Sequence, residues 1–415
     1  MEIPTSHPPV NSGPFAGVRL PARLAVTGML AAGVWTVFGP WLPGGRWVAV
    51  HLFTLGVLTP AVVGFTAHFT GSLLMTRGEA KPPIALLAAG IVGTLAGVGS
   101  TTPWLSGTAA TVLTAAVIVN YVRIRRARKA TLQPRWVWMA RRWERAHGAF
   151  VHGAILGVLM AVGWLPGTWY GTARLAHLHV NLLGWGGITL LATACMFGPM
   201  ALRTRMQETA PAVTARWTSR SATGLTIGVL ALLATAVGGD VGTALRFLAA
   251  AGLAVYAVGA TVVATILVRT RATAPGRHWN GDAIVLAIVV LAVASWLDVI
   301  VVASAAWRYL DALGVLVIAG TLLLAIVGAL GTVAPWTFGG AREGRDQVRE
   351  SLQGLGYVRL TMVAGGTMLA ATGAAVRSLP GQVMVLRTGW ALIILAVAWS
   401  IAKVARHALT PRSPG

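Results

Sequence analysis

Histidine is the residue type in this 415-residue chain whose positions most clearly suggest chemistry. Six of the nine histidines fall in long apolar segments, where an ionisable side chain is costly and is a functional candidate by default. Neutral imidazole is a common ligand of haem iron and copper. The sequence therefore predicts metal or haem binding, with a proton relay or simple helix packing as the alternatives. The six candidates are His51, His68, His147, His152, His177 and His179.

The spacing of these histidines places them at two depths. His68 follows His51 by 17 residues, which at a helical rise of about 1.5 Å per residue separates them by roughly 25 Å, too far for one site. We expect His51, His177 and His179 near the outer face of a membrane, and His68, His147 and His152 near the inner face. Two residues span about 200° of a helix, so His177 and His179 should point in roughly opposite directions.

A shared pattern, HxxxLG, begins at His51 and again at His179. Two imidazoles on facing helices are a usual way for a helical bundle to hold a b-type haem. We therefore expect His51 and His179 to hold the outer centre, with His177 as an additional metal ligand, to copper for example.

The inner histidines give a weaker pattern. His68 and His152 are the expected inner pair, and two stacked haems would then conduct electrons across the bilayer. His147 is a further candidate metal ligand, although its place beside Arg145 at the water boundary makes a packing role the simpler interpretation.

One acidic residue, Asp298, lies deep in an apolar segment. It is either a functional residue or the partner of Arg308 or Arg387 in a pair that fastens helices. Few other carboxylates accompany the histidines, so a proton relay or an ion-coupled transporter has less support than a metal centre.

The elements that position these residues must be membrane helices. Hydrophobic residues make up 56% of the chain and charged residues 11%, and the mean hydropathy is +0.72, which excludes a soluble globular protein. We predict an all-α, polytopic integral membrane protein with about twelve spans in one bundle. The single cysteine, Cys195, excludes an intrachain disulfide framework and covalent c-type haem. The expected spans lie near residues 20–41, 47–75, 82–104, 106–124, 147–168, 174–200, 217–238, 243–268, 282–305, 309–335, 355–377 and 382–404.

The distribution of the basic residues, which give the chain a net charge of +22, predicts its orientation in the membrane. Alternate loops hold most of the lysine and arginine, above all residues 123–145, so the positive-inside rule places both termini in the cytoplasm. That basic loop fits anionic lipid headgroups better than nucleic acid. We divide the chain into a cytoplasmic tail (1–19), a histidine-bearing half (20–205), a histidine-poor half (206–405) and a second tail (406–415). The basic residues of the opposite loops are Arg46, Arg174, Arg246, Arg308, Arg377 and Arg387.

The string HLFTLGVLT at residues 51–59, followed by Gly64 and His68, and the string AHLHVNLLGWGG at residues 176–187 resemble NnrS-type membrane proteins, and more distantly subunit I of haem-copper oxidases and nitric oxide reductases. The resemblance implies twelve spans in a bacterial cytoplasmic membrane, bound haem and copper, and a role in nitric oxide metabolism or electron transfer. It carries ligand roles onto His51, His68, His177 and His179. The late helices lack the further histidines of an oxidase, so a proton-pumping oxygen reductase is not expected.

Membrane lipids and an extracytoplasmic cupredoxin or copper enzyme are the partners that this interpretation predicts. Two functions of other classes remain open. The chain could be a transporter or permease whose histidines bind substrate or protons, or a membrane anchor or assembly partner of a copper oxidase or nitrite reductase.

Overall fold

The computed structural model describes residues 16–75, 83–339 and 342–409, and in this part of the chain every regular element is helical. The predicted all-α class is confirmed for these residues. Most of both predicted tails, and the connection that contains Arg77 and Lys81, lie outside the described residues.

Nine helical stretches of the described residues are long and apolar enough to cross a membrane. The chain is therefore a multi-pass membrane protein by length and composition. Three further predicted positions also hold helices, which are α4 (Ile84–Gly99), α6 (Val137–Ala161) and α15 (Gly356–Ala375). Of these, α4 is short, and none of the three is counted among the nine. The nine stretches are Arg19–Trp41, Gly45–Leu74, Pro103–Ala130, Gly167–Leu202, Ala210–Val237, Gly239–Ala272, Trp279–Ala303, Trp307–Phe338 and Gln382–Arg406.

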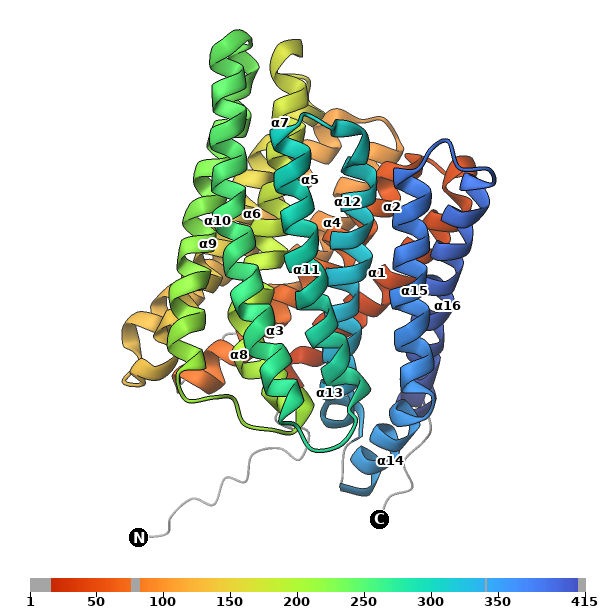
Figure 1. Cartoon of the computed structure of the whole chain (residues 1–415). Coiled ribbons are helices and arrows are strands. Elements are labelled where there is room, and N and C mark those ends of the chain that lie inside the picture. Colours follow the sequence, from red (N-terminus) through yellow and green to blue (C-terminus); the bar gives the residue numbers. More distant parts are fainter. Residues whose placement is uncertain (1–15, 76–82, 340–341, 410–415) are drawn as a thin grey trace.

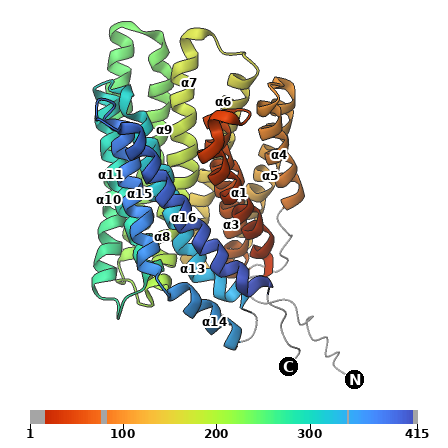
Figure 2. The same cartoon turned by 90° about the vertical axis from the view of Figure 1, so that its right-hand side faces the viewer.

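The helices follow one another as antiparallel neighbours in a single bundle (Figure 1). Pairs such as α9 with α10 and α15 with α16 pack along their length, and α4 with α5 forms one edge (Figure 2). The main helices are α1 (Arg19–Phe38), α2 (Gly45–Phe53), α3 (Thr59–Leu74), α4 (Ile84–Gly99), α5 (Pro103–Ala130), α6 (Val137–Ala161), α7 (Gly167–His179), α8 (Ile188–Leu202), α9 (Ala210–Ala234), α10 (Gly239–Ala272), α11 (Trp279–Ala303), α12 (Leu310–Val315), α13 (Leu324–Phe338), α14 (Arg342–Gln353), α15 (Gly356–Ala375) and α16 (Gln382–Leu409).

Glycine lets several of these helices approach closely. Lipid supplies no hydrophobic force between helices, so membrane bundles depend on close packing and use small residues at contacts. A Cβ atom on Gly252 of α10 would lie 2.6 Å from the carbonyl oxygen of Gly224 on α9. Gly97 of α4 faces Ser106 of α5 in the same way, whereas a Cβ on Gly365 would meet nothing within 4 Å.

Three long helices each contain a π-helical segment: η3 (Thr54–Leu58), η5 (Val180–Gly187) and η8 (Leu316–Leu323). Such widened turns are uncommon and often mark functional sites. The three segments meet at Gly186 of η5, where an added Cβ would lie 3.3 Å from Leu58 of η3 and 2.8 Å from Leu322 of η8. η3 begins three residues after His51, and η5 begins directly after His179.

The two ends of the bundle differ in charge. At the end that we call the basic end, α1 begins, α16 finishes and α14 packs against α13 and α16 (Figure 1). Arg19 Nε there donates to the Thr337 carbonyl at 3.1 Å, and Lys403 Nζ donates to the Ser351 carbonyl at 2.7 Å. The basic α5–α6 connection, with an ion pair between Arg128 and Glu144, also lies at this end.

Candidate metal centre

Two predicted ligands, His51 of α2 and His177 of α7, line one cavity in the half of the bundle away from the basic end. The cavity has a volume of about 130 Å³ and is lined by residues of α2, η3, α4, α5, α6, α7 and η5. Its wall is mainly aliphatic, with the aromatic rings of Trp47, Phe150 and Trp185. A pocket of this kind, apolar with a few polar groups, is typical of a small-ligand or cofactor site.

Backbone carbonyls fix the orientation of both imidazoles. His51 Nδ1 lies 2.9 Å from the Trp47 carbonyl oxygen, and His177 Nδ1 lies 2.8 Å from that of Gly153. A carbonyl oxygen can only accept, so each Nδ1 carries the proton and donates. Each Nε2 then keeps its lone pair, the tautomer that metal-binding histidines adopt with the same type of supporting hydrogen bond. No hydrogen bond to either Nε2 is seen within the described part of the chain.

The two rings are at a separation that suits a shared metal. Their centroids lie 6.3 Å apart with an interplanar angle of 29°. A metal–nitrogen distance of about 2.0 Å puts two opposed nitrogens about 4 Å apart and their ring centres about 6 Å apart. The centroid separation of His51 and His177 therefore matches that of two imidazoles on one metal ion.

α6 provides a groove for the helix that carries His177. A Cβ on Gly157 would lie 3.0 Å from His177 Cε1, and a Cβ on Gly153 would collide with the Asn181 amide. Asn181 Nδ2 donates to the His177 carbonyl at 2.8 Å. These contacts were missed from the sequence, although two glycines four residues apart on a helix face are a recognisable signal for close approach.

An aromatic ring backs the His51 imidazole. Trp47 stacks on His51 with centroids 3.6 Å apart and an interplanar angle of 12°, one helical turn before it. The Trp47 side chain is partly exposed. His51 is thus held by a ring contact and by a backbone hydrogen bond to the same residue.

His179 is directed elsewhere. It is buried, its Nδ1 donates to the Leu175 carbonyl at 2.7 Å, and its Nε2 lies 3.0 Å from Oδ2 of Asp298 on α11. The prediction that His177 and His179 point in opposite directions is confirmed. Both ring nitrogens of His179 are occupied, so the structure brings His51 together with His177 rather than with His179 as the sequence suggested.

The partner of Asp298 also differs from expectation. We considered Arg308 or Arg387, whereas the carboxylate contacts His179, and the Arg308 guanidinium lies over the Tyr309 ring. Because His179 Nδ1 already donates to a carbonyl, a separate proton must lie between Nε2 and the carboxylate. The pair is therefore neutral overall, as imidazolium with carboxylate or as imidazole with carboxylic acid.

His147 belongs to a polar network in the core. It is fully buried, its Nδ1 donates to the Trp143 carbonyl at 2.7 Å, and its Nε2 accepts from Asn120 Nδ2 at 2.8 Å. Asn120 also donates to Thr66 Oγ1 at 3.0 Å, which ties α3, α5 and α6 together. Both nitrogens are satisfied, which fits the packing interpretation better than metal ligation.

The two histidines of the predicted inner pair lie on different helices, α3 and α6. His152 projects from an exposed face of α6, where its Nδ1 donates to the Gly148 carbonyl at 2.7 Å, while His68 is half-buried with its ring 5.0 Å from that of Phe69. In the residues described by the structure, no three histidine, cysteine or acidic side chains form a group that could hold a metal ion.

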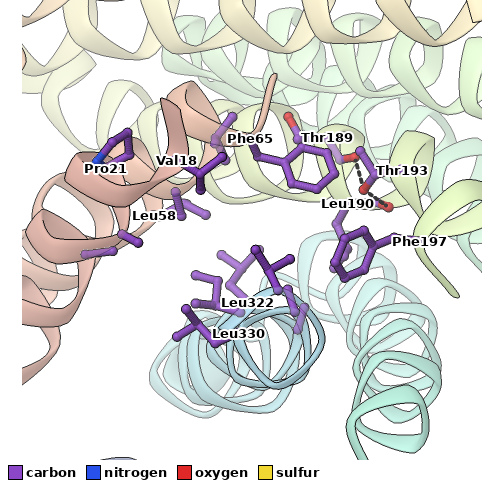
Figure 3. Close-up of a pocket in the computed structure, with 18 of the residues that line it drawn as sticks. Val18, Pro21, Leu58, Phe65, Thr189, Leu190, Thr193, Phe197, Leu322 and Leu330 are labelled. Carbon is purple, nitrogen blue, oxygen red and sulfur yellow. Dashed lines mark hydrogen bonds between the residues drawn. The ribbon is translucent and has the colours of Figure 1, made fainter. Parts of the chain in front are cut away.

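A second cavity lies toward the basic end, between α1, α3, α8 and α13 (Figure 3). It has a volume of about 160 Å³, and no histidine is among its lining residues. The Thr189 and Thr193 hydroxyls on its wall donate to backbone carbonyls one turn earlier. Leu58 lines both cavities, so this apolar space adjoins the histidine-bearing one.

Comparison with protein-family models and with curated proteins gives no match for this chain.

Proposed function

We propose that this protein is a membrane metalloprotein that holds a transition metal, haem iron or copper, between His51 and His177. The observation that carries the proposal is the pair of imidazoles lining one cavity 6.3 Å apart, each with Nδ1 donating to a carbonyl and Nε2 available as a ligand. The physiological role is nitric oxide or other nitrogen-oxide metabolism, or membrane electron transfer. The resemblance to NnrS-type proteins supports this role.

The residues present fit copper and haem differently. Two neutral imidazoles are suitable ligands for copper, and the cavity volume of about 130 Å³ is roughly ten times the space that one water molecule needs. The cavity therefore has room for a copper ion with small ligands. The same two imidazoles would hold the iron of a b-type haem, whose macrocycle would need the aliphatic side chains of the wall to move aside.

We further propose twelve spans in a bacterial cytoplasmic membrane, with the basic end in the cytoplasm. The basic α5–α6 connection supports this orientation through the positive-inside rule. The start of α1 and the end of α16 then lie on the cytoplasmic side, and the cavity of His51 and His177 lies toward the outer face. The α5–α6 connection would contact anionic headgroups.

The test is the metal content and visible spectrum of protein purified from copper-supplemented, haem-replete cells. We expect bound metal in the wild type and its loss in His51→Ala and in His177→Ala. A Soret band that sharpens on reduction identifies haem, whereas copper by elemental mass spectrometry without that band identifies copper. Addition of nitric oxide should change the spectrum or the electron paramagnetic resonance signal of the bound metal.

His152→Ala is the matched control, because it removes an imidazole from an exposed face of the neighbouring helix α6. It should retain the metal of the wild type. A folded, metal-free wild-type preparation would refute the proposal and favour a transporter. Metal that survives in both cavity variants would place the centre at other ligands.

A further inference from the structure

Three arginines surround one carboxylate at the outer end of the bundle. Asp311, at the start of α12, pairs with Arg46 at 2.9 Å and lies 3.8 Å from Arg377, and Arg174 adds to the positive potential at the same carboxylate. The arginine side chains of the two pairs are 71% and 67% exposed. One negative charge among three positive charges leaves this cluster, which we call the outer arginine cluster, with a net positive charge.

The outer arginine cluster lies next to the proposed metal centre. Arg46 directly precedes Trp47, whose ring stacks on His51, and Arg174 lies one helical turn before His177. Trp47 is 38% exposed at the surface and lines the cavity on its other side. Because the Trp47 ring is stacked on His51, the two rings form a continuous route from this surface to the proposed metal.

We propose that the outer arginine cluster is the docking surface for an acidic one-electron donor protein, and that electrons enter through the stacked rings of Trp47 and His51. This inference rests on the proposed metal centre. Complementary charge fits such a partner, because it accelerates encounter and fixes orientation while adding little lasting affinity. In each transfer the partner loses one electron and the metal gains one, so no further reactant is needed.

Small redox probes of opposite charge test the surface without an identified partner. The reduced protein, in nanodiscs of uncharged phosphatidylcholine, is oxidised by ferricyanide, an anion, or by tris(phenanthroline)cobalt(III), a cation. Each reagent takes one electron from the metal. We expect ferricyanide to react faster at low ionic strength and to slow as salt rises, because the screening length falls to about 8 Å at 0.15 M. The cationic probe should show the opposite salt dependence.

Removal of positive charge from the outer arginine cluster should change the rates of oxidation by the two probes differently. In Arg174→Gln/Arg377→Gln, which keeps the Arg46–Asp311 ion pair, we expect ferricyanide oxidation to slow on the order of tenfold at low salt, within the range of electrostatic steering. The cationic probe should not slow. Arg220→Gln, a change of the same charge type beside Trp217 on the cytoplasmic side, is the control and should leave both rates unchanged.

Substitutions of Trp47 test the electron route through the stacked rings of Trp47 and His51. Trp47→Leu should slow both probes, whereas Trp47→Phe, which keeps an aromatic ring, should restore most of the rate. If the protein holds metal but both probes react alike and ignore the arginine changes, the docking surface is refuted and the metal centre stands. If the purified protein holds no metal, both proposals fail together.

Discussion

The contact between His179 and Asp298 gives a prediction that separates the two possible roles of His179. Asp298→Leu removes the carboxylate and leaves His179 Nε2 facing an apolar side chain in the bundle interior. Asp298→Asn instead keeps a donor, because the Asn amide can donate to Nε2 while Nδ1 still donates to Leu175. We expect the leucine variant to be clearly less stable than the asparagine variant.

The expected magnitude follows from burial. His179 is 6% exposed and Asp298 7% exposed, so water cannot replace a lost partner. An unsatisfied buried polar group costs about 1–3 kcal/mol, and breaking a buried ionised pair costs about 3–5 kcal/mol. Asp298→Leu should therefore destabilise the protein by about 1–5 kcal/mol, whereas Asp298→Asn should cost less than about 1.5 kcal/mol, since one hydrogen bond is kept.

The assay is thermal unfolding in detergent, combined with a double-mutant cycle. His179→Leu/Asp298→Leu removes both polar groups, so the double variant should be less destabilised than the sum of the single variants. Because neither residue is among those lining the His51 cavity, metal content should stay at the wild-type level in all folded variants.

Two results would refute this reasoning. If the single-variant costs simply add, His179 and Asp298 are not coupled in the protein. If Asp298→Asn folds normally but loses the metal, His179 belongs to the metal centre and the contact seen here is not the one in the loaded protein.

Two glycine predictions can be checked with matched pairs on single helices. Gly157→Val should lower metal content by displacing His177, whose Cε1 lies 3.0 Å from a Cβ at this position, whereas Gly148→Ala, with nothing within 4 Å, should retain the metal. Gly28→Ala places a Cβ inside the van der Waals distance of the η3 backbone and should lower thermal stability by about 1–3 kcal/mol. Gly33→Ala on the same helix makes an ordinary 3.6 Å contact and should not. Equal effects within either pair would contradict the packing argument.

The sequence predicted the directions of His177 and His179 better than their partners. Depth follows from helical rise and direction from helical rotation, so the divergence of His177 and His179 could be worked out without a structure. Pairing depends on how helices rotate about their axes, and the shared HxxxLG pattern contains no information on that rotation. The similarity of His51 and His179 in sequence therefore did not make them neighbours.

The contacts that set the rotation come from residues with weak sequence signals. Gly153 and Gly157 define where α7 packs on α6. Glycine is frequent throughout this chain, however, and most of the glycines do not lie beside a candidate histidine ligand. Asp298 was recognised as unusual because an acid in an apolar segment is expensive. Its partner lies 119 residues away in sequence, on a helix whose register no local pattern determines.

The hydrogen bonds of the ring nitrogens distinguish His51 and His177 from His147 and His179 more clearly than the predicted depths do. His147 and His179 use both ring nitrogens within the fold, and each would have to give up a buried hydrogen bond to bind a metal. His51 and His177 use only Nδ1, and the lone pair that remains belongs to a ring lining a cavity. All four histidines thus donate through Nδ1 to a backbone carbonyl, and the additional partner on Nε2 distinguishes His147 and His179 from the two histidines of the proposed metal centre.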